Sequence, residues 1–454
     1  MKKSTRKQFN FYCYNPPTSG LYYVNGFEYF AGEDFRSVER YKQYKAMGND
    51  MLMLRYENSY NGEEWETCNA KMAWKKALSA GIKKIFITDR RIDDIINHGK
   101  ILIGDQPECR FKSEKELDEK LIEWTSVYKD MPGFYGIQLV DEPVYEKFVR
   151  YGQVARSLRR ILPGIYLQCN LFPMGTRIPG ETDPIAEYRR YVGEFLDLTG
   201  IDCVCVDPYP FRREYIIYGF EITTHQIIAE ECKKRGVEFH AVMQAFSSVT
   251  EFIYRWRAVN ERDMYWQMNL ALGFGVNEYS FYTYFPKPVT DYIKGKGELN
   301  GTGIMNLDGS PTNMYYYLKR IIKEFKKFAP VQLKYKYQNS YIITEKGKTY
   351  RDFEQSALAL IYDGCPIDVK IDKGVAIVTE LVNGDDKLFM IQNIDNIKEE
   401  YFNGAQPMKV EFTLPDGKKT FYYRGEKFDL TPANGVYSTQ IKIGDAIFVE
   451  LIKN

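Results

Sequence analysis

Histidine is scarce in this chain of 454 residues, which contains only His98, His225 and His240. None of the three lies in an H-E-x-x-H or H-x-H pattern, so a zinc site built on histidine is not expected. The sequence has no G-x-S-x-G turn to supply the serine of a hydrolase triad. Its eight cysteines form no C-x-x-C pair. These absences argue against zinc chemistry and against a nucleophilic triad.

The chain lacks an excess of either charge, because 62 Lys and Arg residues face 61 Asp and Glu residues and leave a net charge of +1. A protein that binds nucleic acid needs a surplus of positive charge, so nucleic acid is not an expected partner. No apolar run approaches the roughly 18 residues that cross a bilayer. We therefore expect neither a nucleic-acid partner nor a membrane, and the oligomeric state stays open.

The N-terminus is basic, but it leads into Gln8-Phe9-Asn10 without the apolar segment of a signal peptide. We expect a cytoplasmic protein with reduced thiols, or an exported protein if a signal peptide has been removed. Cys203 and Cys205 lie two residues apart in an apolar run, which is typical of small core residues on one face of a strand.

Aromatic residues are abundant, with 37 Tyr, 28 Phe and 5 Trp making up 15% of the chain. Tyrosine-rich surfaces suit ligands that have apolar faces and hydroxyl rims, and sugars are the leading example. Codon bias explains the excess equally well, because Tyr, Phe, Lys, Ile and Asn are all frequent together. The aromatic content therefore favours a carbohydrate ligand only in combination with other features.

Short β-type runs alternate with amphipathic helical stretches from residue 9 to about residue 330. Ser113 and Glu116 form a capping box before one helix, and Asn260 and Ser310 are expected to open two others. The run Ile201–Val206 is too apolar to have a wet face, as expected when helices cover a sheet. Eight β/α units in a row predict a (β/α)8 barrel over residues 1–330, rather than an open doubly wound sheet. The expected strands are Phe11–Tyr14, Met51–Tyr56, Ile82–Thr88, Phe134–Val140, Ile165–Asn170, Ile201–Val206, Val237–Met243 and Val276–Thr283.

The pattern changes after Pro330 to period-2 alternation with little helix. Turn pairs occur at Asn403-Gly404, Asp416-Gly417 and Asn434-Gly435. Residues 331–454 are therefore predicted to form an antiparallel β-sandwich, and about 120 residues can bury a core of their own. The expected strands are Val375–Val382, Lys387–Gln392, Met408–Thr413 and Ala446–Ile452.

The residues that follow each expected barrel strand are the candidates for function, because a (β/α)8 barrel carries its active site at the C-terminal ends of its strands. Carboxylates, amides and aromatic rings gather there. Carboxyl groups can act as acid and base, amides can bind hydroxyls, and rings can stack on sugar faces. The pattern therefore indicates a glycoside substrate. The candidates are Arg55, Asp89, Asp141, Glu142, Asn170, Asp207, Tyr209, Gln244, Trp256 and Tyr284.

The most specific motif is Asp141-Glu142-Pro143 after the fourth expected strand. It resembles the strand-four signature of clan-A glycoside hydrolases, usually Asn-Glu-Pro, in which the Glu is the acid/base. The stretch from Ala271 to Tyr284 is similar to the family 42 β-galactosidase type. The resemblance covers nearly the whole chain. It implies that Glu142 is the acid/base and that Asp141 replaces the Asn that usually contacts the sugar 2-hydroxyl.

Gln244 stands where the resemblance places the nucleophilic Glu. An amide cannot attack an anomeric carbon as a carboxylate does. Three interpretations remain open: an engineered knockout, a family that has moved its second carboxylate, or a barrel that binds sugar without cleaving it. Asp207 is our choice for a moved carboxylate. A carboxyl separation of about 5 Å from Glu142 would mean retention of configuration, and about 6.5–9.5 Å would mean inversion through a water.

Each candidate also has a purely structural interpretation. Asp141 and Glu142 could stabilise the start of the following helix, Asp207 could bond its own turn, and Asp89 could pair with a neighbouring arginine. Any single aromatic residue of the rim is more often packing than a sugar platform; the rings considered are Phe172, Tyr209, Phe211, Trp256 and Tyr284.

Two further acids are weaker candidates. Glu278 falls early in the last expected barrel strand, toward the non-catalytic end. Glu251 lies in the loop after the seventh strand and is held in reserve. Neither is assigned a role.

We predict a glycoside hydrolase that cleaves an oligo- or polysaccharide, with Glu142 as proton donor and Asp207 as second carboxylate. No metal or organic cofactor is expected, because acid–base displacement at an anomeric centre needs neither. One alternative is a barrel-type glycoside phosphorylase, in which Arg55, Arg90 or Arg212 would bind phosphate. The other is a non-catalytic carbohydrate-binding barrel.

Overall fold

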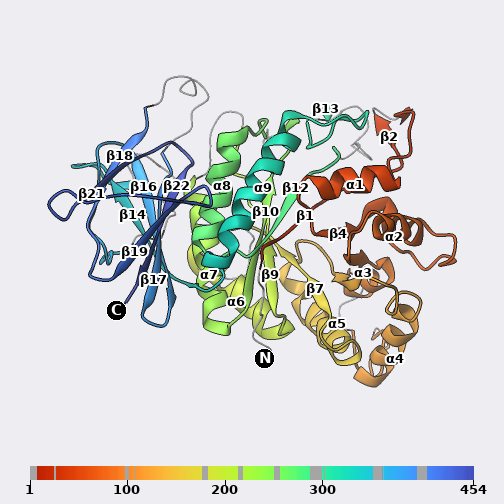
Figure 1. The fold of residues 1–454 in the computed structure, drawn as a ribbon. Coiled ribbons are helices and arrows are strands. Elements are labelled where there is room, and N and C mark those ends of the chain that lie inside the picture. Colours follow the sequence, from red (N-terminus) through yellow and green to blue (C-terminus); the bar gives the residue numbers. More distant parts are fainter. Residues whose placement is uncertain are drawn as a thin grey trace.

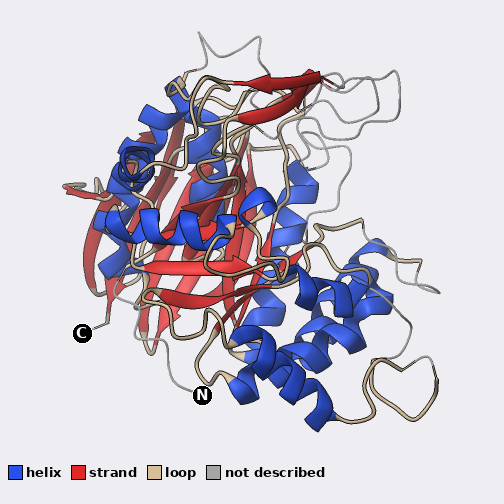
Figure 2. Cartoon of the chain, turned by 90° about the vertical axis from the view of Figure 1, so that its right-hand side faces the viewer, coloured by secondary structure: helices blue, strands red, loops and turns tan. Residues whose placement is uncertain are grey.

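The computed structural model describes the chain from residue 8 to residue 453, with several gaps. The described residues are 8–24, 27–97, 102–107, 109–175, 182–212, 218–249, 256–286, 299–300, 302–350, 360, 362–395 and 406–453. Helices surround a core of strands in the first part of the chain, and a β domain follows it (Figures 1 and 2). The turn pair Asn403-Gly404, His98 and Glu251 lie outside the described residues.

Two parallel sheets form the core of the first part, and they contain all eight expected strands. One sheet has the order β4-β5-β6-β7, and the other has the order β1-β12-β10-β9-β8. Every pairing within them is parallel. The strands are β1 (Asn10–Cys13), β4 (Met51–Leu54), β5 (Lys84–Thr88), β6 (Phe134–Gln138), β7 (Tyr166–Gln168), β8 (Asn170–Leu171), β9 (Cys203–Val206), β10 (Glu238–Gln244) and β12 (Glu278–Tyr282).

The two sheets meet at both of their edges. β7 and β8 are one strand interrupted at Cys169, whose carbonyl accepts from the Cys205 N–H at 2.9 Å. At the other junction, the Asp50 N–H donates to the carbonyl of Phe11 at 2.8 Å, which joins the start of β4 to β1. The eight strands therefore follow one another side by side in chain order.

Helices follow the strands, and two of the three capping signals stand at the predicted helix starts. Ser113 accepts from the Glu116 N–H at 3.2 Å, but the Glu116 carboxylate accepts from the Lys112 N–H at 2.6 Å, so this capping box is incomplete. The Asn260 side chain accepts from the backbone N–H groups of Arg262 and Asp263, in a full capping box. Ser310 does not open the last helix; Thr312 is its N-cap, because Ser310 donates instead to Asp308. The helices are α1 (Val38–Ala46), α2 (Asn69–Ser79), α3 (Arg90–Asn97), α4 (Glu114–Thr125), α5 (Phe148–Ile161), α6 (Pro184–Thr199), α7 (Tyr218–Arg235), α8 (Glu261–Gly273) and α9 (Asn313–Gln332).

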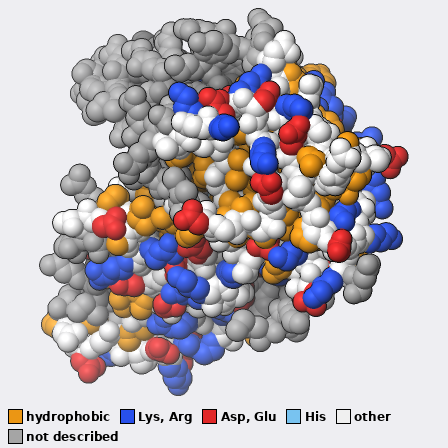
Figure 3. Space-filling model, turned by 90° about the vertical axis from the view of Figure 1, so that its left-hand side faces the viewer, with side chains coloured by type: hydrophobic (Ala, Val, Ile, Leu, Met, Phe, Trp, Pro, Cys, Tyr) orange, Lys and Arg blue, Asp and Glu red, His pale blue; other side chains and the backbone are white. Residues whose placement is uncertain are grey.

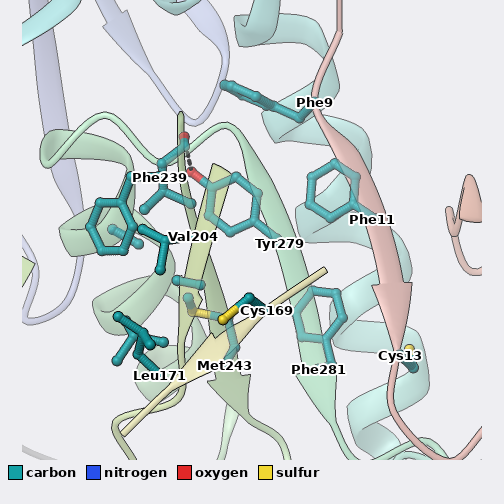
Figure 4. Packing of buried hydrophobic residues seen from close by; sticks show 14 of the residues in the cluster. Phe9, Phe11, Cys13, Cys169, Leu171, Val204, Phe239, Met243, Tyr279 and Phe281 are labelled. Carbon is teal, nitrogen blue, oxygen red and sulfur yellow. Dashed lines mark hydrogen bonds between the residues drawn. The ribbon is translucent and has the colours of Figure 1, made fainter. Parts of the chain in front are cut away.

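Alternate residues of the parallel strands belong to two different hydrophobic clusters. Phe11, Met243 and Phe281 pack toward the helices, in the large cluster whose centre Figure 4 shows. The residues between them face inward and form a separate cluster. This is the period-2 alternation that strands impose when both of their faces are buried. The inner cluster comprises Tyr12, Tyr14, Met51, Met53, Phe86, Tyr166, Cys203, Cys205 and Val242, so the expectation that Cys203 and Cys205 share one face is confirmed.

The C-terminal part consists of two antiparallel sheets. The larger has the order β14-β16-β17-β22-β19-β20, and the smaller has the order β15-β18-β21. A hydrophobic cluster between them takes Val378 and Val449 from the larger sheet and Phe412 from the smaller one. The strands are β14 (Lys336–Thr344), β15 (Val369–Ile371), β16 (Val375–Asn383), β17 (Asp386–Asn393), β18 (Met408–Phe412), β19 (Lys418–Tyr423), β20 (Glu426–Phe428), β21 (Tyr437–Ile441) and β22 (Ala446–Ile452).

The other face of the larger sheet packs against the helices of the first part (Figure 1). Met390 belongs to the large core cluster, and the Gln392 Nε2 donates to the carbonyl of Trp266 at 2.8 Å. The expected domain limit at residue 330 falls inside α9, which continues to Gln332. Figure 3 shows the side of the molecule that carries the β domain, where positive and negative side chains are interspersed.

Several short elements have no counterpart in the expected strands. A hairpin of β2 (Leu21–Val24) and β3 (Phe27–Phe30) follows β1, and β11 (Ser248–Val249) pairs with β13 (Leu299–Asn300). In the described part of the chain, no helix is long and apolar enough to cross a membrane.

Candidate active site

The C-terminal ends of four strands bring polar side chains to one place. Arg55 follows β4, Asp141 and Glu142 follow β6, Asn170 begins β8, and Asp207 follows β9. The N–H of Glu142 donates to the carbonyl of Asn170 at 2.8 Å, which fixes the β6 end against β8. The structure therefore brings these five residues together at one rim.

Glu142 has a left-handed backbone, with a φ of +48°, which is uncommon for a residue other than glycine. This conformation interrupts the strand alternation that would send Asp141 and Glu142 to opposite sides. The charges of both residues raise the pKa of Asp207, so both carboxyl groups lie near it. Left-handed φ values also occur at Asn15 and Tyr56, which follow β1 and β4. Strained backbone of this kind is often found at functional sites.

Arg55 holds Asp141 by a salt bridge of 2.9 Å between Nη2 and Oδ2. The guanidinium carbon lies 5.4 Å from the ring centre of Tyr14 and 5.0 Å from that of Tyr56. Two buried atoms of the pair, Arg55 Nη1 and Asp141 Oδ1, make no hydrogen bond within the described residues. Such atoms carry a desolvation cost that a bound ligand with matching polar groups would relieve.

Glu142 and Asp207 are neighbouring carboxyl groups. Burial, and then the charge of Asp141, raises the pKa of Glu142 to about 7, while Arg55 and a hydrogen bond with Asp207 oppose the rise. Asp207 is 8% exposed, and burial followed by the charges of Glu142 and Asp141 raises its pKa well above the usual range. A half-buried and a buried carboxyl group side by side do not both ionise readily, which is the physical reason for the raised pKa values.

An aromatic wall borders the carboxyl pair. The Tyr209 hydroxyl donates to Asp207 Oδ2 at 3.2 Å. The ring centre of Tyr209 lies 5.0 Å from that of Phe246, 6.4 Å from that of Trp256 and 5.9 Å from that of Tyr282. Two of these four rings, Tyr209 and Trp256, were candidates from the sequence.

Gln244 lies fully buried beside this wall, and its side-chain amide forms hydrogen bonds with backbone groups. Its Oε1 accepts from the N–H of Phe211 at 3.0 Å, and its Nε2 donates to the Phe211 carbonyl at 3.1 Å. The backbone N–H of Gln244 in turn donates to Gln267 Oε1 at 2.8 Å. These bonds indicate that the Gln244 amide stabilises the fold, a role that the sequence did not indicate.

Asp89 and Tyr284 are not brought to the carboxyl pair by any contact of the described residues. Asp89 is fully buried and accepts from Arg91 Nη2 at 2.7 Å and from the Tyr128 hydroxyl at 3.0 Å, as the arginine-pairing interpretation expected. Tyr284 packs edge-on against Tyr44 of α1, with ring centres 5.0 Å apart.

The site contains residues that the sequence did not mark. Burial raises the pKa of Asp93 on α3 to about 7, while the nearby Arg55 and Arg90 oppose the rise. Tyr14 and Tyr282, whose ring centres are 6.0 Å apart, line the same region. Their places after the first strand and at the end of the last one could have indicated them, but no motif marks Asp93.

Glu278 lies at the opposite end of the strands, as its position early in β12 predicted. It accepts from Asn10 Nδ2 at 2.9 Å and from the Tyr166 hydroxyl, and its Oε1 lies 3.2 Å from His240 Nδ1. Burial lowers the pKa of His240, but Glu278, Cys203 and Glu238 together outweigh it and raise that pKa above its usual value. Within the described residues, no three His, Cys, Asp or Glu side chains are arranged to hold a metal ion.

Comparisons with known proteins give likeness in structure only. No protein-family model matches the sequence, and a search of curated proteins finds no match. An Anoxybacillus α-amylase superposes with a TM-score of 0.53 at 10% identity, over 100% of both chains. A glycoside hydrolase family 5 structure from Bacteroides vulgatus superposes with a TM-score of 0.50 at 12% identity, over 92% of this chain and 87% of that one. This chain therefore shares its fold with these two proteins.

A β-galactosidase from the psychrophilic Marinomonas ef1 superposes with a TM-score of 0.45 at 11% identity. The match covers 65% of this chain and 58% of the galactosidase, so this chain spans less than two thirds of that protein. A likeness at this level carries no argument about substrate. The resemblance to the family 42 type therefore stays a prediction.

Proposed function

We propose that the two parallel sheets are arcs of one (β/α)8 barrel and that the protein is a glycoside hydrolase acting on an oligo- or polysaccharide. The backbone contacts at both junctions of the sheets support the barrel. The fold shared with glycoside hydrolases and the carboxyl groups at the C-terminal ends of the strands support the activity. The C-terminal β domain then stabilises the barrel and contributes no catalytic group.

The observation that carries this proposal is the pair of neighbouring carboxyl groups, Glu142 and Asp207, that follow β6 and β9. Glycoside cleavage at neutral pH needs a carboxylic acid that is still protonated and can donate to the leaving oxygen. A pKa of about 7 for Glu142 meets this need. Glu142 is also less buried than Asp207, so it is the better placed of the two to reach a substrate. We assign Glu142 as proton donor.

Asp207 is the second carboxyl group of the proposed mechanism. The charge of Glu142 raises the pKa of Asp207, so the two carboxyl groups are neighbours at the strand ends. Their separation decides the stereochemistry, because about 5 Å fits retention and about 6.5–9.5 Å fits inversion through a water. We propose that Asp141, Arg55, Asn170, Tyr209 and Trp256 bind the sugar, and that Asp89, Gln244 and Tyr284 stabilise the fold instead.

A panel of oligosaccharides, polysaccharides and aryl glycosides tests the activity, with released reducing ends as the readout. The wild type should hydrolyse at least one substrate, and Glu142→Gln should abolish this hydrolysis while it still binds the sugar. The panel is repeated with inorganic phosphate, because a phosphorylase would release a sugar phosphate only in its presence. Binding without any turnover across the panel would instead favour a non-catalytic carbohydrate-binding protein.

A further inference from the structure

Asp141 has an unused acceptor next to the proposed proton donor. Arg55 bonds Asp141 Oδ2, whereas Asp141 Oδ1 is buried without a hydrogen-bond partner in the described part of the chain. A carboxylate oxygen accepts hydrogen bonds, so an N–H or O–H group of a bound ligand would pair with Oδ1. Because Asp141 directly precedes Glu142 and both act on Asp207, that donor belongs to a sugar atom close to the cleaved bond.

Asn170 provides a second, independent indication of a ligand at this place. Its side chain is fully buried, and its Oδ1 has no hydrogen-bond partner among the described residues. The amide lies close enough to Asp207 to affect the ionisation of that carboxyl group. Together with Arg55 Nη1, these atoms form a pocket of unsatisfied donors and acceptors beside Glu142. A small polar substituent of the sugar, with both a donor and an acceptor, would satisfy them.

The protein groups nearest Glu142 are poorly suited to attack an anomeric carbon. Burial, followed by the charges of Glu142 and Asp141, raises the pKa of Asp207 well above its usual range, and a carboxyl group that holds its proton is a hydrogen-bond donor rather than a nucleophile. Asp141 is adjacent to Glu142 in sequence, so it cannot lie across the sugar from it. The amide of Gln244 is held by the backbone of Phe211.

We propose that the substrate is a 2-acetamido-2-deoxy glycoside and that its own acetamido oxygen attacks the anomeric carbon, while Asp141 Oδ1 accepts the acetamido N–H. The acetamido group has the donor and the acceptor that the pocket lacks. Its attack requires the group and the leaving oxygen to lie on opposite faces of the ring, so the substrate has the 1,2-trans arrangement of a β-gluco or β-galacto sugar. This inference rests on the proposed glycosidase function and defines its substrate class.

The reaction then has two balanced steps. Glu142 gives its proton to the glycosidic oxygen, the bond from C1 to that oxygen breaks with its electron pair going to the leaving alcohol, and the acetamido oxygen bonds to C1. The resulting oxazolinium ion is stabilised through its N–H by the Asp141 carboxylate. Water then gives a proton to Glu142 and its oxygen bonds to C1, while the bond from C1 to the acetamido oxygen breaks. The product is a hemiacetal of retained configuration.

Matched aryl glycosides test this proposal with the full-length protein. The 2-acetamido β-glucoside and β-galactoside are compared with the corresponding 2-hydroxy compounds, and we expect kcat/KM to be about 100-fold or more higher for at least one acetamido sugar, since a well-placed internal group reacts with a large effective concentration. Replacing the acetyl group by mono-, di- and trifluoroacetyl weakens the attacking oxygen and should lower kcat progressively.

Asp141→Asn tests the assigned residue, and Asp183→Asn is its matched control. Asp183 is the N-cap of α6, a position that asparagine fills equally well. Asp141→Asn should lower kcat on the acetamido sugar by about 10- to 1000-fold, the usual range for losing such a group, and should change the response to fluorination. The control should behave as the wild type. Thermal melting establishes that each variant is folded.

The two proposals fail in different ways. If no glycoside of any kind is hydrolysed, the glycosidase function itself is wrong. If 2-hydroxy glycosides are hydrolysed as fast as acetamido sugars, or a 2-deoxy-2-fluoro glycoside leaves a covalent adduct on a protein carboxylate by intact mass, the function stands and this inference is overturned. Inverted product configuration by NMR would also overturn it.

Discussion

Gln244 and Phe211 are joined by a two-way hydrogen bond. The amide oxygen of Gln244 accepts from the Phe211 N–H at 3.0 Å, and the amide nitrogen donates to the Phe211 carbonyl at 3.1 Å. This contact ties the end of β10 to the loop after β9, which carries Asp207 and Tyr209. A glutamate at position 244 could accept the first bond but could not, when ionised, donate the second.

The first prediction is that Gln244→Glu destabilises the protein and creates no hydrolase activity. A buried carboxylate facing the Phe211 carbonyl should cost about 2–4 kcal/mol of the free energy of unfolding, through a lost hydrogen bond and an unpaired charge. Urea denaturation measures this loss, and Gln244→Met, which removes both bonds without adding a charge, is the control. A gain of retaining hydrolysis in Gln244→Glu would instead show that a nucleophile had been restored.

The second prediction concerns Asp89, which we expect to support the fold. Asp89→Asn weakens the bonds to Arg91 and Tyr128 and leaves the guanidinium partly unpaired. Breaking a buried pair of this kind typically costs about 3–5 kcal/mol. The melting temperature should fall, whereas kcat measured well below the transition should stay close to that of the wild type. A normal melting temperature with lost turnover would place Asp89 in the site.

The third prediction is a pH-dependent gain of stability in Glu142→Gln. In the folded chain the pKa of Glu142 is about 7, against about 4.3 for an unfolded glutamate, so the folded state binds the proton more tightly between these values. The free energy of unfolding therefore falls as the pH rises through this window. Removing the group should stabilise the variant relative to the wild type by about 1–3 kcal/mol at pH 8 but little at pH 4.

Urea titrations at pH 4, 6 and 8 measure this effect. Glu119→Gln is the control, because Glu119 lies exposed on α4 and forms a surface pair with Lys115. It should change stability little, and equally at each pH. A constant difference between Glu142→Gln and the wild type across the three pH values would mean that Glu142 ionises normally.

The fourth prediction is that the barrel requires the C-terminal β domain for stability but not for chemistry. A chain that ends at Gln332 would expose the apolar surface that Met390 covers and would lose the bond from Gln392 to the Trp266 carbonyl. It should be poorly soluble or melt at a lower temperature. Stable folding with full activity would contradict this, and a specific loss of turnover from one point change beyond residue 332 would contradict the absence of catalytic groups there.

The sequence predicted the parallel strands well, because strands covered on both faces appear as short apolar runs between helical segments. Several strands of the C-terminal β domain were missed, among them the edge strand β14 and the inner strand β19. β14 and β19 carry exposed polar residues such as Lys336 and Lys418, so they lack the dense apolar pattern of β16 and β22. The start of α9 was placed too early because Ser310 is a good capping residue that bonds within its own turn instead.

The candidate site was predictable where a side chain directly follows a strand, as at Arg55, Asn170 and Asp207. The sequence did not predict which of several nearby groups a side chain would bond. Asp89 lies at a strand end yet turns to Arg91, and Gln244 bonds backbone groups of a loop 33 positions away. Asp93 gained its raised pKa from burial, which depends on tertiary packing and leaves no mark in the sequence.

The most direct test of the central claim is the rate of Glu142→Gln on two glycosides of the same sugar, one with a poor leaving group and one with an activated aryl group. Without its acid, the enzyme should lose about 10²–10⁴-fold on the poor leaving group, the usual size of general-acid catalysis. The loss should be much smaller on the activated glycoside, whose leaving oxygen needs little protonation. Near-normal rates on the natural oligosaccharide, or equal losses on both substrates, would contradict the assignment of Glu142 as proton donor.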